Sequence, residues 1–391
     1  MGRERWVAVA RDVARRLAVD AVEREAKAAE PVVEVALLRD SGLLPLMIPA
    51  ERGGHGEDWT TAHAVLAQVA AADASVGHLL GYHYLHVWRS RLFDRPELAE
   101  RIDRETTANG YFWAGVANPR DDALVLSDVD GRFEVRGRKF FATGASVADR
   151  LVVSALHEST GRKLTFVLDA NAPGVRYLGD WDNLGQRLSA SGGVEFAGVR
   201  VDRDDVLGAQ PAPGAPGVHR DSLAALGFQL VLSRVLVATG RGALDEAARY
   251  TRETTRAWPA SGVERAVDDP HTTAGYGTLI ARLDAADLLV DAAVAAYDDA
   301  EARGPDLTAQ ERGATALRIS AAKVVASELA TEIGSRVFEL TGARATAARH
   351  GLDRFWRNAR TLTLHDPAVY KATELGRHLL TGELPPATGY S

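Results

Sequence analysis

The sequence predicts an α+β protein, mostly α, in which a β-rich middle part separates two helical parts. Long stretches with apolar residues at helical spacing lie at both ends of the chain. Short β-rich runs lie between them, and a Pro/Gly/Ala-rich stretch follows the last run. We therefore expect an N-terminal helical domain over 1–110, a middle β domain over 111–208 and a C-terminal helical bundle domain over 209–391. Because helices and strands do not alternate, this order excludes a Rossmann fold.

The N-terminal part is expected to form helices. Residues 3–29 place charged and small apolar residues at helical spacing, and residues 32–42 do the same up to a glycine. After a glycine-rich loop, a further helix is predicted to begin with Thr60 as its cap and to end at Ala72. Another is predicted over 75–92.

The middle part is predicted to form six or more strands, arranged as a barrel or a sandwich. Asp130-Gly131 is a turn of the kind that joins two antiparallel strands. The C-terminal part is predicted to form an antiparallel bundle of four long helices with a shorter one after them. The expected bounds are 219–256, 270–303, 309–341 and 351–364, with the short helix ending near Leu380.

Composition limits the chemistry that this chain can perform. Its 391 residues include no cysteine, which excludes thiolate nucleophiles, disulfides and cysteine-bound metals. A net charge of -7 argues against a surface for nucleic acid or anionic membrane. The N-terminus lacks the apolar core of a signal peptide, and the apolar segment 223–240 carries Gln229, Ser233 and Arg234, as a buried helix can. We expect a cytoplasmic protein without a membrane or nucleic-acid partner.

The densest mixture of polar and aromatic residues is 353–371. His365 comes just before Pro367, a predicted helix stop, so its side chain is expected at a helix end facing a cleft. A solvated basic face that ends in a capping histidine fits the same pattern equally well. Arginines at every third position lie along one side of the expected helix; they are Arg354, Arg357 and Arg360.

His78, Tyr82 and His86 follow one another at i,i+4 spacing and so share one helix face. A core helix rarely lines one side with so many polar-tipped rings. No metal site is expected, because His78, His83 and His86 lack a carboxylate at ligand spacing and aromatic packing explains them more simply. The chain also lacks the G-x-S-x-G motif of serine hydrolases, and the glycines at 240–242 lie in a helical pattern that no strand precedes.

Several scattered residues would suit a large, planar, anionic ligand. Thr143 offers a hydroxyl and is followed by backbone amides that a ligand could approach closely, while Trp181 could cover a planar ring. Arg256, expected at a helix end, together with Arg344 and Thr346, would suit a phosphate or a ribityl chain. The alternatives remain a tryptophan packed in a β core, solvated arginines and a simple helix-ending turn.

Taken together, these stretches resemble the acyl-CoA dehydrogenase superfamily over essentially the whole chain. The closer resemblance is to its flavin-dependent monooxygenase branch, typified by the dibenzothiophene monooxygenases. The stretches that carry it are SGLLPLMIPAERGGHGEDW, VAAADASVGHLLGYH, GRKFFATGA, GDWDNLGQR, GALDEAARYTRETTRAWP and GLDRFWRNARTLTLHDPAVYK.

The resemblance implies an acyl-CoA dehydrogenase-like fold and a two-component monooxygenase. Reduced FMN, supplied by a separate flavin reductase, would react with O2 to give a C4a-hydroperoxyflavin. This species would oxygenate sulfur, nitrogen or a ring position of a small aromatic, heteroaromatic or organosulfur substrate. A homotetramer is the habit of the family, and FAD is the alternative cofactor.

The resemblance also assigns roles to individual residues. It implies that Thr143 and Trp181 lie near the isoalloxazine ring, and that His365 occupies the position where true dehydrogenases carry their catalytic glutamate. Residues implied near the flavin phosphate and ribityl chain are Arg256, Arg344 and Thr346. Residues implied in the oxygen-activating pocket are His78, Tyr82 and His365.

The sequence departs from the branch at two positions near the expected flavin. Val116 replaces an asparagine of the sulfur-oxidising enzymes, with Asn118 two residues on and expected on the same strand face, and Thr143 replaces a serine. The dehydrogenase loop is replaced by ANPRDDAL. An acyl-CoA dehydrogenase or oxidase with Asp366 or Asp221 as a displaced base, and a non-catalytic assembly protein, are the alternatives.

Overall fold

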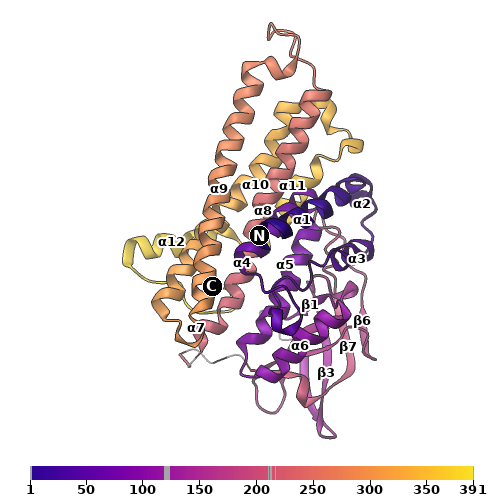
Figure 1. The fold of residues 1–391 in the computed structure, drawn as a ribbon, viewed down its shortest axis with the longest axis vertical. Helices are drawn as coiled ribbons and strands as arrows, with labels where there is room; N and C mark the ends of the chain where they lie inside the picture. Colours follow the sequence, from indigo (N-terminus) through magenta and orange to yellow (C-terminus); the bar gives the residue numbers. More distant parts are fainter. Residues whose placement is uncertain (1, 119–123, 210, 212–213, 216, 391) are drawn as a thin grey trace.

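The computed structural model describes residues 2–118, 124–209, 211, 214–215 and 217–390. Within them, helices come first, a sheet follows, and a second set of helices ends the chain (Figure 1). This arrangement confirms the predicted fold class. The Pro/Gly/Ala-rich stretch and the ANPRDDAL loop lie partly outside the described residues.

The N-terminal helices are α1 Gly2–Ala18, α2 Ala21–Lys27, α3 Val32–Asp40, α4 Trp59–Ala72, α5 Ala74–Trp88 and α6 Pro96–Asn109. The single helix predicted over 3–29 is therefore two helices. Arg24 of α2 donates to Leu17 O at 2.8 Å and to Asp73 Oδ2 at 2.9 Å. These bonds satisfy a carbonyl at the end of α1 and fix α2 at a new angle.

Two further helix ends differ from the prediction. Helix α4 begins at Trp59 because Asp58 is its cap, with Oδ1 accepting from Thr61 N at 2.7 Å. The hydroxyl of Thr60, predicted to be the cap, instead donates to Asp298 Oδ2 at 2.6 Å. Helix α5 ends at Trp88, and the predicted remainder is a short 3-10 turn.

The middle part is one eight-stranded sheet, with the strand order β6-β7-β3-β2-β4-β5-β8 and β1 beside β4. Its β2–β3 hairpin turns at Asp130 and Gly131, whose φ angles of 50° and 79° suit a tight hairpin turn, as predicted. The strands are β1 Trp113–Val116, β2 Leu124–Val129, β3 Arg132–Lys139, β4 Arg150–His157, β5 Lys163–Asp169, β6 Val175–Tyr177, β7 Val194–Val201 and β8 Val206–Ala209.

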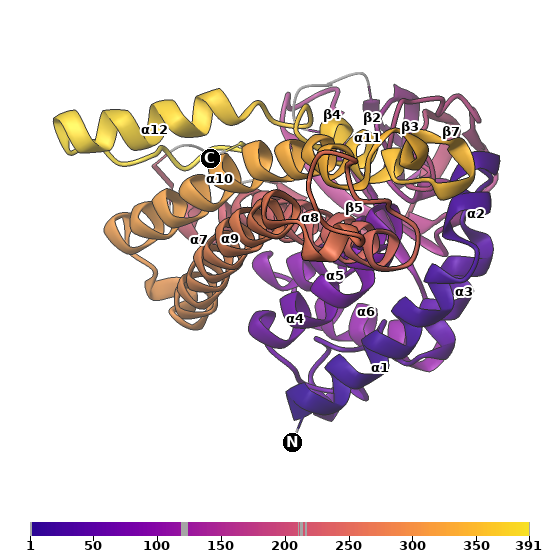
Figure 2. The same ribbon diagram turned by 90° about the horizontal axis from the view of Figure 1, so that it is seen from above.

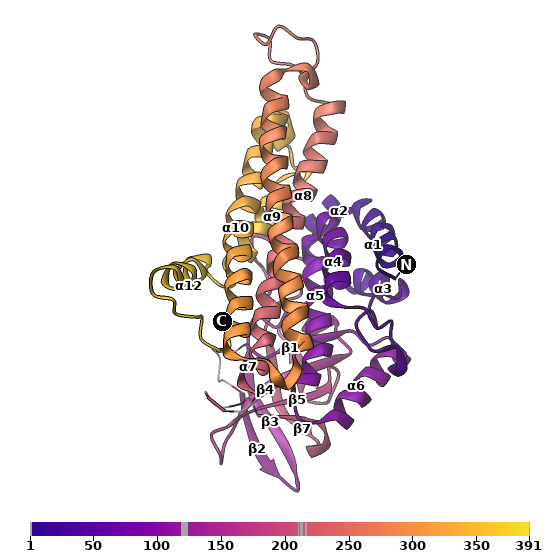
Figure 3. The same cartoon turned by 60° about the vertical axis from the view of Figure 1, so that its left-hand side comes forward.

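The C-terminal helices are α7 Val218–Asp221, α8 Leu223–Glu253, α9 Pro270–Ala302, α10 Ala309–Thr341, α11 Asp353–Leu362 and α12 Ala368–Thr381. Helices α8, α9 and α10 run side by side far beyond the rest of the molecule (Figure 3). Figure 2 shows α12 extending away from the bundle.

Helix α8 is the centre of the molecule, since it packs against α4, α5, α9, α10 and α11. Its Val218–Glu253 stretch is long and apolar enough to cross a membrane, but 83% of the most apolar window is buried inside the protein. The charged Arg234 is accommodated by ion pairs with Asp287 and Asp291 of α9. Helix α5 lies between α8 and strand β1, and the site described next is built around this helix.

Candidate active site

Helix α5 places three polar rings on one buried face, as the spacing predicted. Asp73 caps this helix by accepting from Ser75 N at 3.0 Å. The ring of Tyr82 meets His78 edge-on, with centroids 4.2 Å apart, and lies 6.2 Å from His86 on its other side. The row is a continuous wall of three aromatic side chains.

Burial keeps this wall uncharged at neutral pH. It lowers the pKa of His78 to about 3, with the charge of His365 acting in the same direction. Burial also takes the pKa of His86 well below its usual value and raises the pKa of the Tyr82 hydroxyl. The wall therefore presents neutral donors and acceptors.

His365 lies in the turn between α11 and α12, opposite this wall. Helix α11 ends at Leu362, and Pro367 caps α12 rather than stopping α11. His365 Nε2 lies 3.3 Å from Tyr82 Oη, and its Nδ1 lies 3.3 Å from Asp366 Oδ2. The turn thus brings together residues 283 positions apart in the chain.

The loop after β6 supplies a buried residue that the sequence analysis did not identify, Gln186. Its Oε1 lies 3.1 Å from His78 Nδ1, and its backbone amide donates to Asn358 of α11. Its carbonyl accepts from Trp181 Nε1 at 2.8 Å. Gln186 therefore joins α5, α11 and Trp181. A single glutamine in a loop carries no periodic signal, so no sequence pattern singled it out.

Thr143 joins the same network through serine hydroxyls. Its Oγ1 lies 2.9 Å from Ser191 Oγ, which lies 2.7 Å from Ser189 Oγ, and Ser189 donates to Gln186 O at 2.8 Å. The expectation that the following amides are open to a ligand is wrong. Gly144 N donates to Ser189 O at 3.0 Å, because the chain turns back on this loop.

Trp181 stands beside the network at the edge of a hollow of about 120 Å³ between the α2–α3 connection and the sheet. The exposed ring of Phe141 lies edge-on to it, with centroids 6.2 Å apart. Three non-glycine residues here have positive φ: Ala190 at 46°, which lines the hollow, and Phe141 at 58° and Gln186 at 56°, which contact Trp181. Such strained backbone is concentrated at functional sites.

The hollow is smaller than sites for drug-sized ligands, which measure roughly 300–1,000 Å³. Two buried atoms of the Gln186 network, His78 Nε2 and Gln186 Nε2, have no hydrogen-bond partner among the described residues. Unpaired buried polar atoms are costly in a protein unless a ligand or water satisfies them.

Val116 and Asn118, both expected near a flavin, do not lie on one strand face as predicted. Val116 is buried in the core as the last residue of β1, paired with Val153 of β4. Asn118 lies beyond the strand end, so strand alternation does not extend to it. The glycine at position 115 leaves room for the His86 ring, since a Cβ there would lie 2.1 Å from His86 Cε1.

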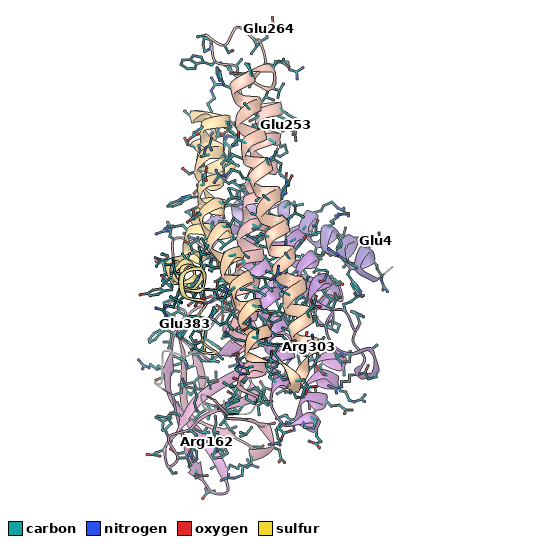
Figure 4. The ribbon with its side chains drawn as sticks, turned by 90° about the vertical axis from the view of Figure 1, so that its left-hand side faces the viewer. Glu4, Arg162, Glu253, Glu264, Arg303 and Glu383 are labelled. Carbon is teal, nitrogen blue, oxygen red and sulfur yellow. The ribbon has the colours of Figure 1, made fainter. Side chains whose placement is uncertain are left out.

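Three predicted ligand residues, Arg256, Arg344 and Thr346, lie beyond the ends of α8 and α10 and are all exposed. Arg256 lies beyond the end of α8, in the loop to α9, rather than at a helix end. The adjoining Thr255 Oγ1 donates to Thr341 O at the end of α10. In Figure 4, Glu253 and Glu264 mark this end, opposite Arg162 of the sheet.

This free end is remote from the pocket. Tyr82 contacts Phe228 near the start of α8, with centroids 4.8 Å apart. The remainder of α8 to Glu253 adds about 40 Å at 1.5 Å per residue. Within one chain, Arg256 therefore lies far from the contact between Tyr82 and His365.

Two arginines of α11, Arg354 and Arg357, make structural hydrogen bonds. Arg357 donates to Glu25 Oε1 at 2.8 Å and to Leu184 O at 3.0 Å, which ties α2 to the Gln186 loop. Arg354 is buried and donates to Gly351 O at 2.9 Å. No group of three or more acidic or histidine side chains suited to a metal occurs in the described part of the chain.

The carboxylates considered as displaced bases have other partners. Asp366 accepts from Gln229 Nε2 and lies beside His365. Burial raises the pKa of Asp221, and the buried guanidinium of Arg89 opposes that rise. Neither is a free carboxylate at the centre of the pocket.

Family models match both helical parts of the chain. Residues 3–90 match the acyl-CoA dehydrogenase N-terminal domain, and residues 230–369 match the acyl-CoA dehydrogenase C-terminal domain. Butyryl-CoA dehydrogenase from Megasphaera elsdenii, at 18% identity and a TM-score of 0.82, shares the fold.

Curated relatives align over almost the whole chain. A probable FMNH2-dependent monooxygenase, SfnC, of Pseudomonas putida is 38% identical, with 98% of this chain and 97% of that protein covered. Dibenzothiophene monooxygenase of Rhodococcus erythropolis is 37% identical, with 97% and 94% covered.

Solved structures of monooxygenases are also similar to this chain over almost its whole length. Methanesulfinate monooxygenase MsuC from Pseudomonas fluorescens superposes with a TM-score of 0.94 at 40% identity, covering 98% of this chain and 99% of that one. FMN-bound TdsC from Paenibacillus sp. A11-2 gives a TM-score of 0.92 at 36% identity, covering 99% and 100%. The chain belongs to the acyl-CoA dehydrogenase superfamily, in the branch that contains these monooxygenases.

Proposed function

We propose that this protein is an FMN-dependent monooxygenase that oxygenates a small organosulfur or heteroaromatic compound. The observation that carries the proposal is the cluster that His365 forms with a wall of neutral polar rings, in a chain similar to monooxygenases over almost its whole length. Reduced FMN, when bound, supplies the electrons that activate O2.

The network that joins Trp181, which lines the hollow, to Gln186 and Thr143 suits the flavin ring. Trp181 and Thr143 belong to the network that ends in the two unpaired atoms, His78 Nε2 and Gln186 Nε2. We assign Trp181 and Thr143 to the isoalloxazine ring and the unpaired atoms to groups of the bound reactants. Val116 and the nearby Asn118 would border the same ring.

The role of the α5 wall follows from its charge state. Neutral His78 and Tyr82 hold oxygen atoms through hydrogen bonds without placing a fixed charge beside the flavin. Burial of both side chains excludes water, which protects a reactive oxygen species from decay. His365 completes the pocket from the opposite side.

The phosphate end of FMN requires a second copy of the chain in this proposal. Arg256 lies far from the contact between Tyr82 and His365 within one chain, yet it is exposed, as are Arg344 and Thr346, and such side chains suit a phosphate. A homotetramer would bring the free end of one bundle to the pocket of another subunit. Exposed apolar residues on α9 and α12 support such contacts; they are Leu288, Val369, Leu379 and Leu380.

Electrons would come from outside the chain. The glycines at 240–242 lie within α8, so they do not form a nicotinamide-binding loop. We infer a separate flavin reductase that delivers reduced FMN by diffusion, in the cytoplasm.

Anaerobic titration with reduced FMN and with reduced FAD tests the proposal. We expect tighter binding of FMN, weakened by Trp181→Leu, and no flavin reduction when butyryl-CoA is added to protein reconstituted with oxidised FAD. Retention of FAD through purification together with its bleaching by butyryl-CoA would establish a dehydrogenase instead.

A further inference from the structure

The His365 side chain connects the pocket to solvent. It is 43% exposed, whereas Tyr82 is 7% exposed and His78 is 3% exposed. Two contacts of 3.3 Å join Asp366 Oδ2 to His365 Nδ1 and His365 Nε2 to Tyr82 Oη. The three side chains form one hydrogen-bonded line, which reaches solvent at its middle member, His365, and the interior at Tyr82.

Neighbouring helices keep Asp366, at one end of this line, ionised. Gln229 of α8 donates to Asp366 Oδ2, and Lys323 of α10 is fully buried nearby. Burial opposes ionisation of Asp366, but the hydrogen bond and charge of His365, with Gln229 and Lys323, hold its pKa below the usual value. An ionised Asp366 accepts a hydrogen bond from Nδ1–H of His365 and leaves Nε2 directed at Tyr82.

The other histidines beside Tyr82 cannot carry a proton inward from water. His78 is buried, and its Nδ1 faces the amide of Gln186, which does not titrate. His86 is also buried and packs against Phe228. Among the described residues in contact with Tyr82, His365 alone combines an imidazole with a solvent-exposed surface.

We propose that Asp366, His365 and Tyr82 form a proton relay in which His365 takes up a proton from water and Tyr82 Oη delivers one into the pocket. Tyr82 is then the catalytic residue that touches the reactants. His365 and Asp366 act through it as positioning residues, whereas the family resemblance implied that His365 acts in the pocket directly. The acceptor in the pocket rests on the proposed function above.

The proton balance of the relay is simple. A proton from water binds His365 Nε2 while the other proton stays on Nδ1, hydrogen-bonded to the ionised Asp366. The new Nε2–H donates a hydrogen bond to Tyr82 Oη, whose own O–H turns towards the bound reactants. When Oη gives its proton to an oxygen atom of the bound reactants, Nε2 passes its proton to Oη. One proton enters from water, one leaves at Oη, and both side chains return to their starting state.

The first test needs no flavin. Diethyl pyrocarbonate modifies an accessible imidazole nitrogen that carries a free lone pair. Trypsin releases His365 in peptide 361–371, where it is the only histidine, and His378 in peptide 378–391 is an internal reference. Tyr82→Phe should raise the rate of His365 modification about fivefold, the change expected when one net hydrogen bond is lost.

The control is Tyr370→Phe, which removes the hydroxyl of an exposed tyrosine on α12. It should leave the His365 rate unchanged. In an Asp366→Asn background, where the ring is no longer held, Tyr82→Phe should have less than half of that effect. Equal His365 rates in wild type and Tyr82→Phe, or an effect that persists in full without Asp366, would overturn the relay.

The second test uses chemical rescue of turnover. His365→Ala leaves a solvent-facing gap, so added imidazole should restore product formation several-fold with reduced FMN and whichever of dibenzothiophene, methanesulfinate or indole the wild type oxygenates. Imidazole should not rescue Tyr82→Phe, because this variant lacks the hydroxyl that delivers the proton to the reactants. Failure of imidazole to rescue His365→Ala would contradict the relay. A wild-type protein inactive on all three probes would count against the proposed substrates. The diethyl pyrocarbonate test would then decide whether the relay exists.

Discussion

Removing the side chain of Asn358 should release the loop that carries Gln186. Asn358 Oδ1 accepts the Gln186 amide, and both residues are at most 4% exposed. Asn358→Ala leaves this buried N–H without a partner, at a cost of about 1–3 kcal/mol in the free energy of unfolding. The loop cannot move inward to compensate, because a Cβ on Gly185 would lie 2.0 Å from Arg357 O.

The loop must therefore move outward and carry Trp181 with it, since Trp181 Nε1 is bonded to Gln186 O. We expect Asn358→Ala to lower the free energy of unfolding of the flavin-free protein by about 2 kcal/mol and to weaken FMN binding. Urea unfolding at one fixed protein concentration measures the first effect, and fluorescence titration with FMN measures the second. Asn109→Ala, at the exposed end of α6, is the control and should change stability by less than about 0.5 kcal/mol. Wild-type stability and FMN affinity in Asn358→Ala would refute this account of the loop.

Three further predictions follow from the contacts. Burial lowers the pKa of His78 to about 3 and of His83 to about 4. As pH falls below about 6.5, these histidines therefore gain protons in the unfolded chain before they do in the folded protein. The free energy of unfolding should drop by about 3 kcal/mol for each histidine between pH 7 and 4. Urea midpoints that do not fall on acidification would contradict this. Gly115→Ala should lower the melting temperature, since overpacking against His86 costs about 1–3 kcal/mol, and an unchanged melting curve would show that the ring yields freely. Arg256→Ala should weaken FMN binding by roughly 1.5–3 kcal/mol if a second copy brings this charge to the phosphate, and unaltered affinity would leave Arg256 in solvent.

Periodic and local signals in the sequence carried most of the fold. The i,i+4 spacing of His78, Tyr82 and His86 correctly put three rings on one helix face, and Asp130-Gly131 correctly marked a hairpin. The break after α1 was missed because it depends on Arg24 reaching Asp73, a contact between distant positions that apolar periodicity does not encode.

The site was predictable only in part for the same reason. His365 could be expected at a turn because Pro367 follows it, but its approach to Tyr82 depends on how α11 packs against α5 and α8. Gln186 gave no signal, since its importance comes from its backbone and side-chain bonds in an irregular loop. The position of Arg256 depends on the length of α8, which carries it away from the pocket.

The central claim is that this protein transfers one oxygen atom from O2 to a small substrate with reduced FMN. The most direct measurement is mass spectrometry of products formed under 18O2 from dibenzothiophene, methanesulfinate and indole, with chemically reduced FMN and no nicotinamide. We predict one 18O atom per oxygenation in the product of at least one probe, dependent on protein, reduced FMN and O2, and lost in Tyr82→Phe. Absence of labelled product from every probe, combined with oxidation of an acyl-CoA by the FAD-loaded protein, would contradict the claim.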